Sequence, residues 1–258
     1  MILRPIDPPS ASSEAVVPAW PILERIQRQH YESCWLVTQP SHAALAGELA
    51  AKMELPHVPK PDAKLLQAIA LHDAGWGPFD AEIIQHCRSD RSFRPASFLE
   101  TPLAHFLNAW KRSIETAQSV SAAGGYIVSR HFHRLGEHRV ATSIDQGPDK
   151  REIESFVQAE SSRQKKLAAK QQLSLQELEL LTDLLQLCDL LSLYVCIGPK
   201  DKALISEYFG IDLQVNTTEQ GVVLDPSIIP SGTQFRVAAL LHPAQAGTSS
   251  KEILIQIA

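Results

Sequence analysis

Residues 174–199 read SLQELELLTDLLQLCDLLSLYVCIGP, and this stretch decides the fold. Ser174 followed by Glu177 fits a capping box, which is a signature of a helix start. Gly198 and Pro199 are residue types at which such a helix stops. Because leucines occupy most faces between these two signals, we expect a long helix at the centre of the core.

Asp189 lies inside this leucine-rich segment and is the most informative residue of the chain. A carboxylate buried alone would cost several kcal/mol, even after the surroundings relax. Asp189 therefore needs a metal, a cation or several hydrogen-bond donors beside it.

Two other predicted helices carry histidines on their apolar faces. The first starts at Thr38 and places His42 with Leu45 and Leu49, while the second opens at Pro61 and ends with the pair His72-Asp73. Taken singly, each histidine fits a hydrogen-bonded core residue better than a metal ligand. Together, the three helices supply two imidazoles and two carboxylates, a set that suits a divalent metal with open coordination positions.

The remaining sequence predicts a mainly α fold with a small C-terminal β-sheet appendage. In the last segment Ile211, Leu213 and Val215 alternate with polar residues, as strands do. The strand-like run 35–38 is a candidate to join that sheet, and 75–100 is expected to be a long, partly helical loop that lines a pocket. The predicted organisation is an irregular N-terminal arm over 1–18, a helical metal-binding domain over 19–210, and a β-rich extension over 211–258 packed on it.

The charge composition limits the kinds of molecule that this protein is expected to bind. The 24 basic and 29 acidic residues give a net charge of −5, which offers no case for binding nucleic acid or an anionic membrane. The N-terminal residues lack a signal-peptide pattern, and no uninterrupted apolar run approaches the roughly 18 residues of a membrane span. We therefore expect a cytoplasmic protein, whose scattered cysteines are reduced.

A lone histidine, an adjacent His-Asp pair and a distant Asp, in that order, resemble the H…HD…D signature of the HD-domain superfamily of metal-dependent phosphohydrolases. The blocks TQPSHAALAGELA, ALHDAGWGPFD and SRHFHRL also look like those of an uncharacterised bacterial branch with an HDxGW block. The resemblance covers roughly residues 33 to 197. It implies a helical bundle around one or two divalent ions, drawn from Mn, Fe, Mg, Ni, Co or Zn.

The resemblance also implies a ligand set. His42, His72, Asp73 and Asp189 match the family's metal ligands, and Asp73 would bridge two ions when two are present. His131 matches the Ser-x-His block and is the expected extra ligand. Two further histidines are less suited, because His133 lies about 200° around the same helix and His105 fits the outer side of its own.

Other residues receive roles at the rim. Asp73 and Asp80 are the expected catalytic carboxylates, although Asp80 fits equally as a turn or helix cap. Arg130 and Arg134 are candidates to bind a phosphoester, with ordinary surface arginines as the alternative. Trp76 is either a pocket wall or part of the core.

Three functions fit this sequence. The first is hydrolysis of a small phosphoester, such as a nucleotide, by metal-activated water. The second is oxidation by O₂ at a di-iron pair, and the third is a non-catalytic metal-binding or ligand-binding sensor. In each case the expected partner is a small molecule, and the sequence also allows a homodimer.

Overall fold

The computed structural model describes residues 1–11, 14–245 and 248–258. The helices are α1 (Ala19–Gln27), α2 (Gln39–Lys52), α3 (Ala63–Ala70), η1 (Ala74–Trp76), α4 (Gly77–Ser89), η2 (Phe98–Glu100), α5 (Leu103–Val120), α6 (Ala122–Ala141), α7 (Gly147–Ala168) and α8 (Leu175–Ile197). The strands are β1 (Ile2–Pro5), β2 (Val17–Pro18), β3 (Cys34–Val37), β4 (Ala203–Ile205), β5 (Leu213–Thr218), β6 (Gly221–Asp225), β7 (Gln234–Gln245) and β8 (Thr248–Gln256). The chain is therefore mainly α-helical with a smaller β part, as expected.

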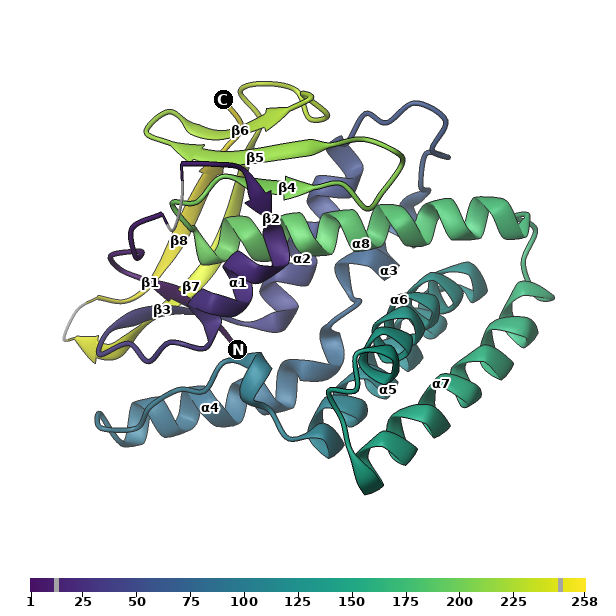
Figure 1. Cartoon of the computed structure of the whole chain (residues 1–258), viewed down its shortest axis with the longest axis horizontal. Coiled ribbons are helices and arrows are strands. Elements are labelled where there is room, and N and C mark those ends of the chain that lie inside the picture. Colours follow the sequence, from purple (N-terminus) through teal and green to yellow (C-terminus); the bar gives the residue numbers. More distant parts are fainter. Residues whose placement is uncertain (12–13, 246–247) are drawn as a thin grey trace.

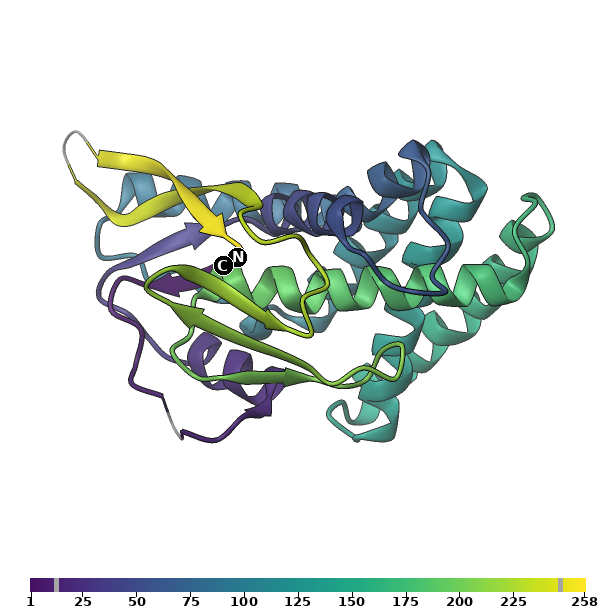
Figure 2. The ribbon, with the colours of Figure 1, turned by 90° about the horizontal axis from the view of Figure 1, so that it is seen from above.

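Helix α8 runs through the middle of the molecule, with α6 and α7 beside its N-terminal half and the strands beside its C-terminal half (Figures 1 and 2). The capping box of Ser174 and Glu177 is formed, and Gly198 ends the helix in the left-handed conformation. By length and composition α8 could cross a membrane, contrary to the expectation that no segment would, but 78% of its most apolar window is buried inside the protein. It is thus the core helix of this fold.

Helices α2 and α6 pack against α8, and α3 packs against both α2 and α6. The predicted start of α2 is confirmed, because the Thr38 side chain accepts a hydrogen bond from the backbone N–H of Ser41. Gly47 lets α2 approach α3 closely, since a Cβ at this position would lie 2.6 Å from the Cβ of Ala70. This close packing brings the segments with the candidate ligands together.

Two four-stranded sheets cover the other end of α8, in the orders β1-β3-β7-β8 and β2-β4-β5-β6. A bridge between Val222 and Ile257 connects the β6 strand with the end of the other sheet. Strand β3 pairs with β7, which confirms that the run near Trp35 joins the C-terminal strands. One hydrophobic cluster extends through the helices and both sheets.

Several expectations about local structure were wrong. The N-terminal arm is not irregular throughout: Met1, Ile2 and Leu3 are buried, and β1 pairs with β3 along its length. Residues 75–100 are mostly helical, because α4 occupies half of the range that lacked a clear periodicity. The C-terminal strands are not an appendage either, since each sheet takes strands from both ends of the chain.

Candidate metal centre

Four of the predicted ligands lie around one point between α2, the turn after α3, and α8. The Oδ1 atom of Asp189 lies 3.1 Å from Nε2 of His42 and 3.2 Å from Nε2 of His72. Oδ2 of Asp73 lies 3.5 Å and 3.9 Å from the same two nitrogen atoms. Both imidazoles are almost completely buried, whereas the carboxylates of Asp73 and Asp189 are 11% and 17% exposed.

The spacing of these atoms fits a divalent ion. Ligand atoms held about 2.1 Å from one ion are separated by about 3.0–3.4 Å in octahedral or tetrahedral geometry. The ligand atoms of His42, His72 and Asp189 all lie within 4.8 Å of one another, so this buried group could hold a metal ion.

Hydrogen bonding orients His72 for the same purpose. Its Nδ1 lies 2.8 Å from the carbonyl oxygen of Ile69, so Nδ1 carries a proton and Nε2 points at the carboxylates. Burial lowers the pKa of His72, but Asp73, Asp189 and the Ile69 carbonyl outweigh burial and raise it to about 9. This imidazole is therefore held by negative charge on the side where an ion would sit.

The two carboxylates have different environments. Burial raises the pKa of Asp73, whereas hydrogen bonds from His42 and His72 overcome burial and lower the pKa of Asp189. Asp189 therefore has the hydrogen-bond partners that a carboxylate within a leucine-rich helix needs.

His131, on α6, approaches Asp189 from the other side. Its Nε2 lies 3.9 Å from Oδ2 of Asp189, the oxygen that does not contact His42 or His72. Its ring lies 5.6 Å from that of His72, and burial lowers its pKa to about 3. The buried Nδ1 of His131 has no hydrogen-bond partner among the described residues. A neutral imidazole thus borders the cluster without being part of its closest contacts.

The turn with His72 and Asp73 is fixed against α5. The backbone N–H of Gly75 donates to the buried hydroxyl of Ser113 at 3.0 Å. A Cβ on Gly75 would lie 2.0 Å from the carbonyl oxygen of Ala109, so only glycine fits here. This contact fixes the position of the turn that carries His72 and Asp73 relative to α5.

Asp80 has a structural environment. Its Oδ2 accepts a hydrogen bond of 2.6 Å from the backbone N–H of Gln39, and Oδ1 lies 2.9 Å from the amino group of Met1. We therefore assign Asp80 a role in anchoring the start of α2, in place of the proton-transfer role that the sequence suggested.

Arg130 and Arg134 lie beside the centre but already have acidic partners. Arg130 Nε is 3.1 Å from Glu179, and Arg134 is 2.9 Å from Glu179 and 2.6 Å from Asp183. A phosphate would have to compete with these carboxylates for either guanidinium.

The other candidates have partners other than the four ligands. Trp76 is buried and packs edge-to-face on Phe106, which places it in the core. His105 is exposed and stacks on Phe79, and His133 accepts a hydrogen bond from Arg130. Among the remaining histidines, His30, His57, His86 and His138 are exposed, whereas His242 is buried.

Sequence reasoning missed Tyr208, in the loop between β4 and β5. Its pKa is raised mainly by burial, and also by the charges of Glu207 and Asp189, while Arg134 lowers it. The phenol therefore lies within electrostatic range of the metal centre. No motif or periodicity marks this residue, because its loop reaches the centre only through the tertiary fold.

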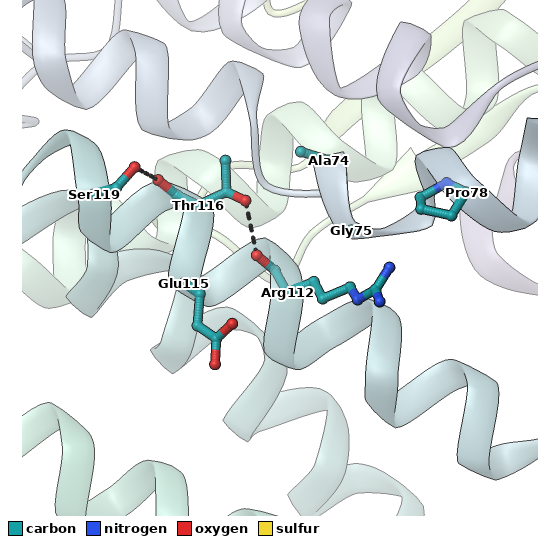
Figure 3. A pocket seen from close by; sticks show the side chains of 7 residues that line it. All are labelled: Ala74, Gly75, Pro78, Arg112, Glu115, Thr116 and Ser119. Atoms are coloured by element: carbon teal, nitrogen blue, oxygen red, sulfur yellow. Dashed lines mark hydrogen bonds between the residues drawn. The ribbon is translucent and has the colours of Figure 1, made fainter.

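A shallow hollow of about 460 Å³ lies between the segment after the HD pair and α5 (Figure 3). Its lining residues are Ala74, Gly75, Pro78, Arg112, Glu115, Thr116 and Ser119. The hydroxyls of Thr116 and Ser119 donate to carbonyls of their own helix, and Arg112 shares the hollow with Glu115. None of the candidate ligands lines it, so we do not assign it to the centre.

Comparison with known proteins gave one family. The family described as "Protein of unknown function (DUF3891)" matches residues 25–233. No curated protein and no solved structure matched the chain. Because the matched residues make up most of the chain and include every candidate ligand, this protein belongs to the DUF3891 family.

Proposed function

We propose that this protein is a metal-dependent phosphohydrolase of the HD type that cleaves a small phosphoester. One observation carries the proposal: Nε2 of His42 and of His72 both lie within 3.2 Å of Asp189 Oδ1, with Asp73 beside them. The order of these residues, H…HD…D, supports the HD type, and the mainly helical fold is compatible with it.

His42, His72, Asp73 and Asp189 would hold the ion. A bound divalent ion would lower the pKa of a coordinated water and polarise a phosphoryl oxygen. The exposed fractions of Asp73 and Asp189, 11% and 17%, leave the carboxylate side open to solvent and to substrate. The neutral imidazole of His131, 3.9 Å from Asp189, could hydrogen-bond to a substrate without adding charge.

The first experiment combines metal analysis with activity. Protein purified without added metal is analysed for bound ions and then assayed with nucleotides and sugar phosphates in the presence of Mn, Co, Ni, Fe or Mg. We expect hydrolysis with at least one metal, and its loss in Asp189→Asn. Absence of hydrolysis over the whole panel would refute the proposed activity.

His131 favours one second candidate, a di-iron oxygenase. Its Nε2 lies closest to Oδ2 of Asp189, whereas His42 and His72 hydrogen-bond to Oδ1, so His131 could serve as a ligand to a second ion. This function requires two irons per chain and an effect of His131→Ala on iron content. A single non-iron ion in protein purified without added metal would count against it.

A further inference from the structure

The guanidiniums beside the metal centre belong to an ion-pair network, which we call the rim network: Arg130, Arg134, Glu179, Asp183 and Gln186. Arg134 donates to Asp183 at 2.6 Å, to Glu179 at 2.9 Å and also to the side-chain oxygen of Gln186. Arg130 donates to Glu179 at 3.1 Å. The two guanidiniums are thus paired with Glu179 and Asp183, and also with Glu137, which lies 3.6 Å from Arg130. The amide of Gln186 takes up part of the remaining donor capacity.

The rim network directly adjoins the candidate ligands. Arg134 lies one helical turn after His131 on α6, and Gln186 lies one turn before Asp189 on α8. The bond between Arg134 and Gln186 therefore connects the two helices next to the contact between His131 and Asp189. The pKa of Tyr208, raised mainly by burial, also responds to Asp189, Asp183 and Arg134, which places all three in electrostatic range of one phenol.

The charged groups of the rim network are more exposed to solvent than the imidazoles of the centre. The ligand imidazoles are 1% exposed and Asp189 is 17% exposed, while Arg134 and Asp183 are 24% and 28% exposed. A substrate bound at Asp189 would therefore lie one helical turn from Gln186, which holds Arg134 of the rim network.

We propose that the rim network selects phosphoesters of low charge, such as phosphodiesters with a single negative charge, and disfavours polyphosphates. This inference rests on the proposed function and names its substrate class. A triphosphate would place several negative charges near the carboxylates of Glu179 and Asp183, which would repel it. It could form an ion pair with Arg134 only if Arg134 broke its charge-assisted hydrogen bonds to these carboxylates. A diester brings only one negative charge, and a bound ion could coordinate one of its phosphoryl oxygens without any need for Arg134.

The test compares substrates that differ in charge. The Mn²⁺-loaded full chain is assayed with bis(para-nitrophenyl) phosphate, para-nitrophenyl phosphate and adenosine triphosphate. We expect kcat/KM for the diester to exceed that for the triphosphate by at least about tenfold, which corresponds to about 1.4 kcal/mol of transition-state discrimination. A preference for the triphosphate would overturn the inference.

Variants of the rim network give a second readout. Asp183→Asn and Glu179→Gln each remove one of the two carboxylates that pair with Arg134, so kcat/KM for the triphosphate should rise relative to that for the diester. The matched control is Glu115→Gln, which removes the same charge from the exposed hollow on α5 and should leave the ratio unchanged. An unchanged ratio in both rim variants would contradict the role of the network.

Binding measurements separate this inference from the proposed activity. Calorimetry of inorganic phosphate and pyrophosphate with the Mn²⁺-loaded protein reports charge selection without turnover. Weaker binding of pyrophosphate, with a gain in Asp183→Asn, supports the inference even if no ester is cleaved. Tighter binding of pyrophosphate by the native chain refutes it, whether or not the protein is a hydrolase.

Discussion

His72 is the residue whose replacement tests the metal centre most directly. We expect His72→Ala to bind metal at least about 100-fold more weakly, because it removes a ligand that the Ile69 carbonyl holds in one orientation. Bound metal is measured by elemental analysis, and helical content by circular dichroism. The control is His105→Ala, an exposed histidine stacked on Phe79. Equal metal content in the two variants would remove His72 from the centre.

The same residue predicts how pH acts on protein that has been stripped with a chelator. The folded-state pKa of His72, about 9, lies above its ordinary value of 6.5. Its stabilising contribution is therefore complete below pH 6.5 and is lost as the pH rises through 9; it is on the order of 3 kcal/mol. Urea unfolding should show this decrease in the native chain and little of it in His72→Ala.

Added metal should change that profile. An imidazole that binds an ion through Nε2 no longer takes up a proton there, so the decrease between pH 6.5 and 9 should disappear in Mn²⁺-loaded protein. A stripped protein whose free energy of unfolding is constant over this range would show that His72 does not carry the expected charge.

Among the secondary-structure elements, the short η1 turn is the one expected to affect the metal centre most, because it connects the pair His72-Asp73 to α4. We expect Gly75→Ala to lower the free energy of unfolding by about 2 kcal/mol or more, since its Cβ would lie 2.0 Å from the Ala109 carbonyl oxygen. Metal affinity should fall as well, because relief of this clash displaces Asp73. Thermal unfolding and metal content measure the two effects.

Gly77→Ala is the matched control for this change. Gly77 begins α4 two residues later, and the nearest atom to its Cβ position is Pro40 Cγ at 3.9 Å. An alanine at this helical position should be neutral or slightly stabilising. Similar losses in both variants would mean that the turn is sensitive to any substitution and not to the contact with α5.

At the scale of the whole molecule, the helices and the sheets form one unit. Strand β7 pairs with β3, and the Tyr194 hydroxyl of α8 donates to the backbone of Asp201 and Val215. We expect a single calorimetric transition, with the calorimetric and van't Hoff enthalpies equal. A chain that ends at Gly210 should fail to fold, because it leaves β3 and the end of α8 uncovered. A folded, soluble fragment 1–210 would contradict this view and restore a separate C-terminal extension.

The sequence predicted those features that depend on local chemistry. The capping residues Thr38 and Ser174 marked helix starts, and the burial cost of Asp189 pointed to polar partners before their positions were known. The sequence did not predict features that depend on contacts between distant segments. The β1 strand looked irregular because its pairing partner lies some thirty residues away, at Cys34–Val37.

Local sequence signals were enough to predict a mainly helical protein whose core helix carries a carboxylate, because capping and hydrophobic periodicity are properties of neighbouring residues. Only the tertiary structure decided what surrounds that carboxylate. The fold pairs Arg134 with Glu179 and Asp183, and it brings Tyr208 within electrostatic range of Asp189. The reason is physical: a burial cost shows that a charge needs partners, but the packing of distant segments selects which ones it receives.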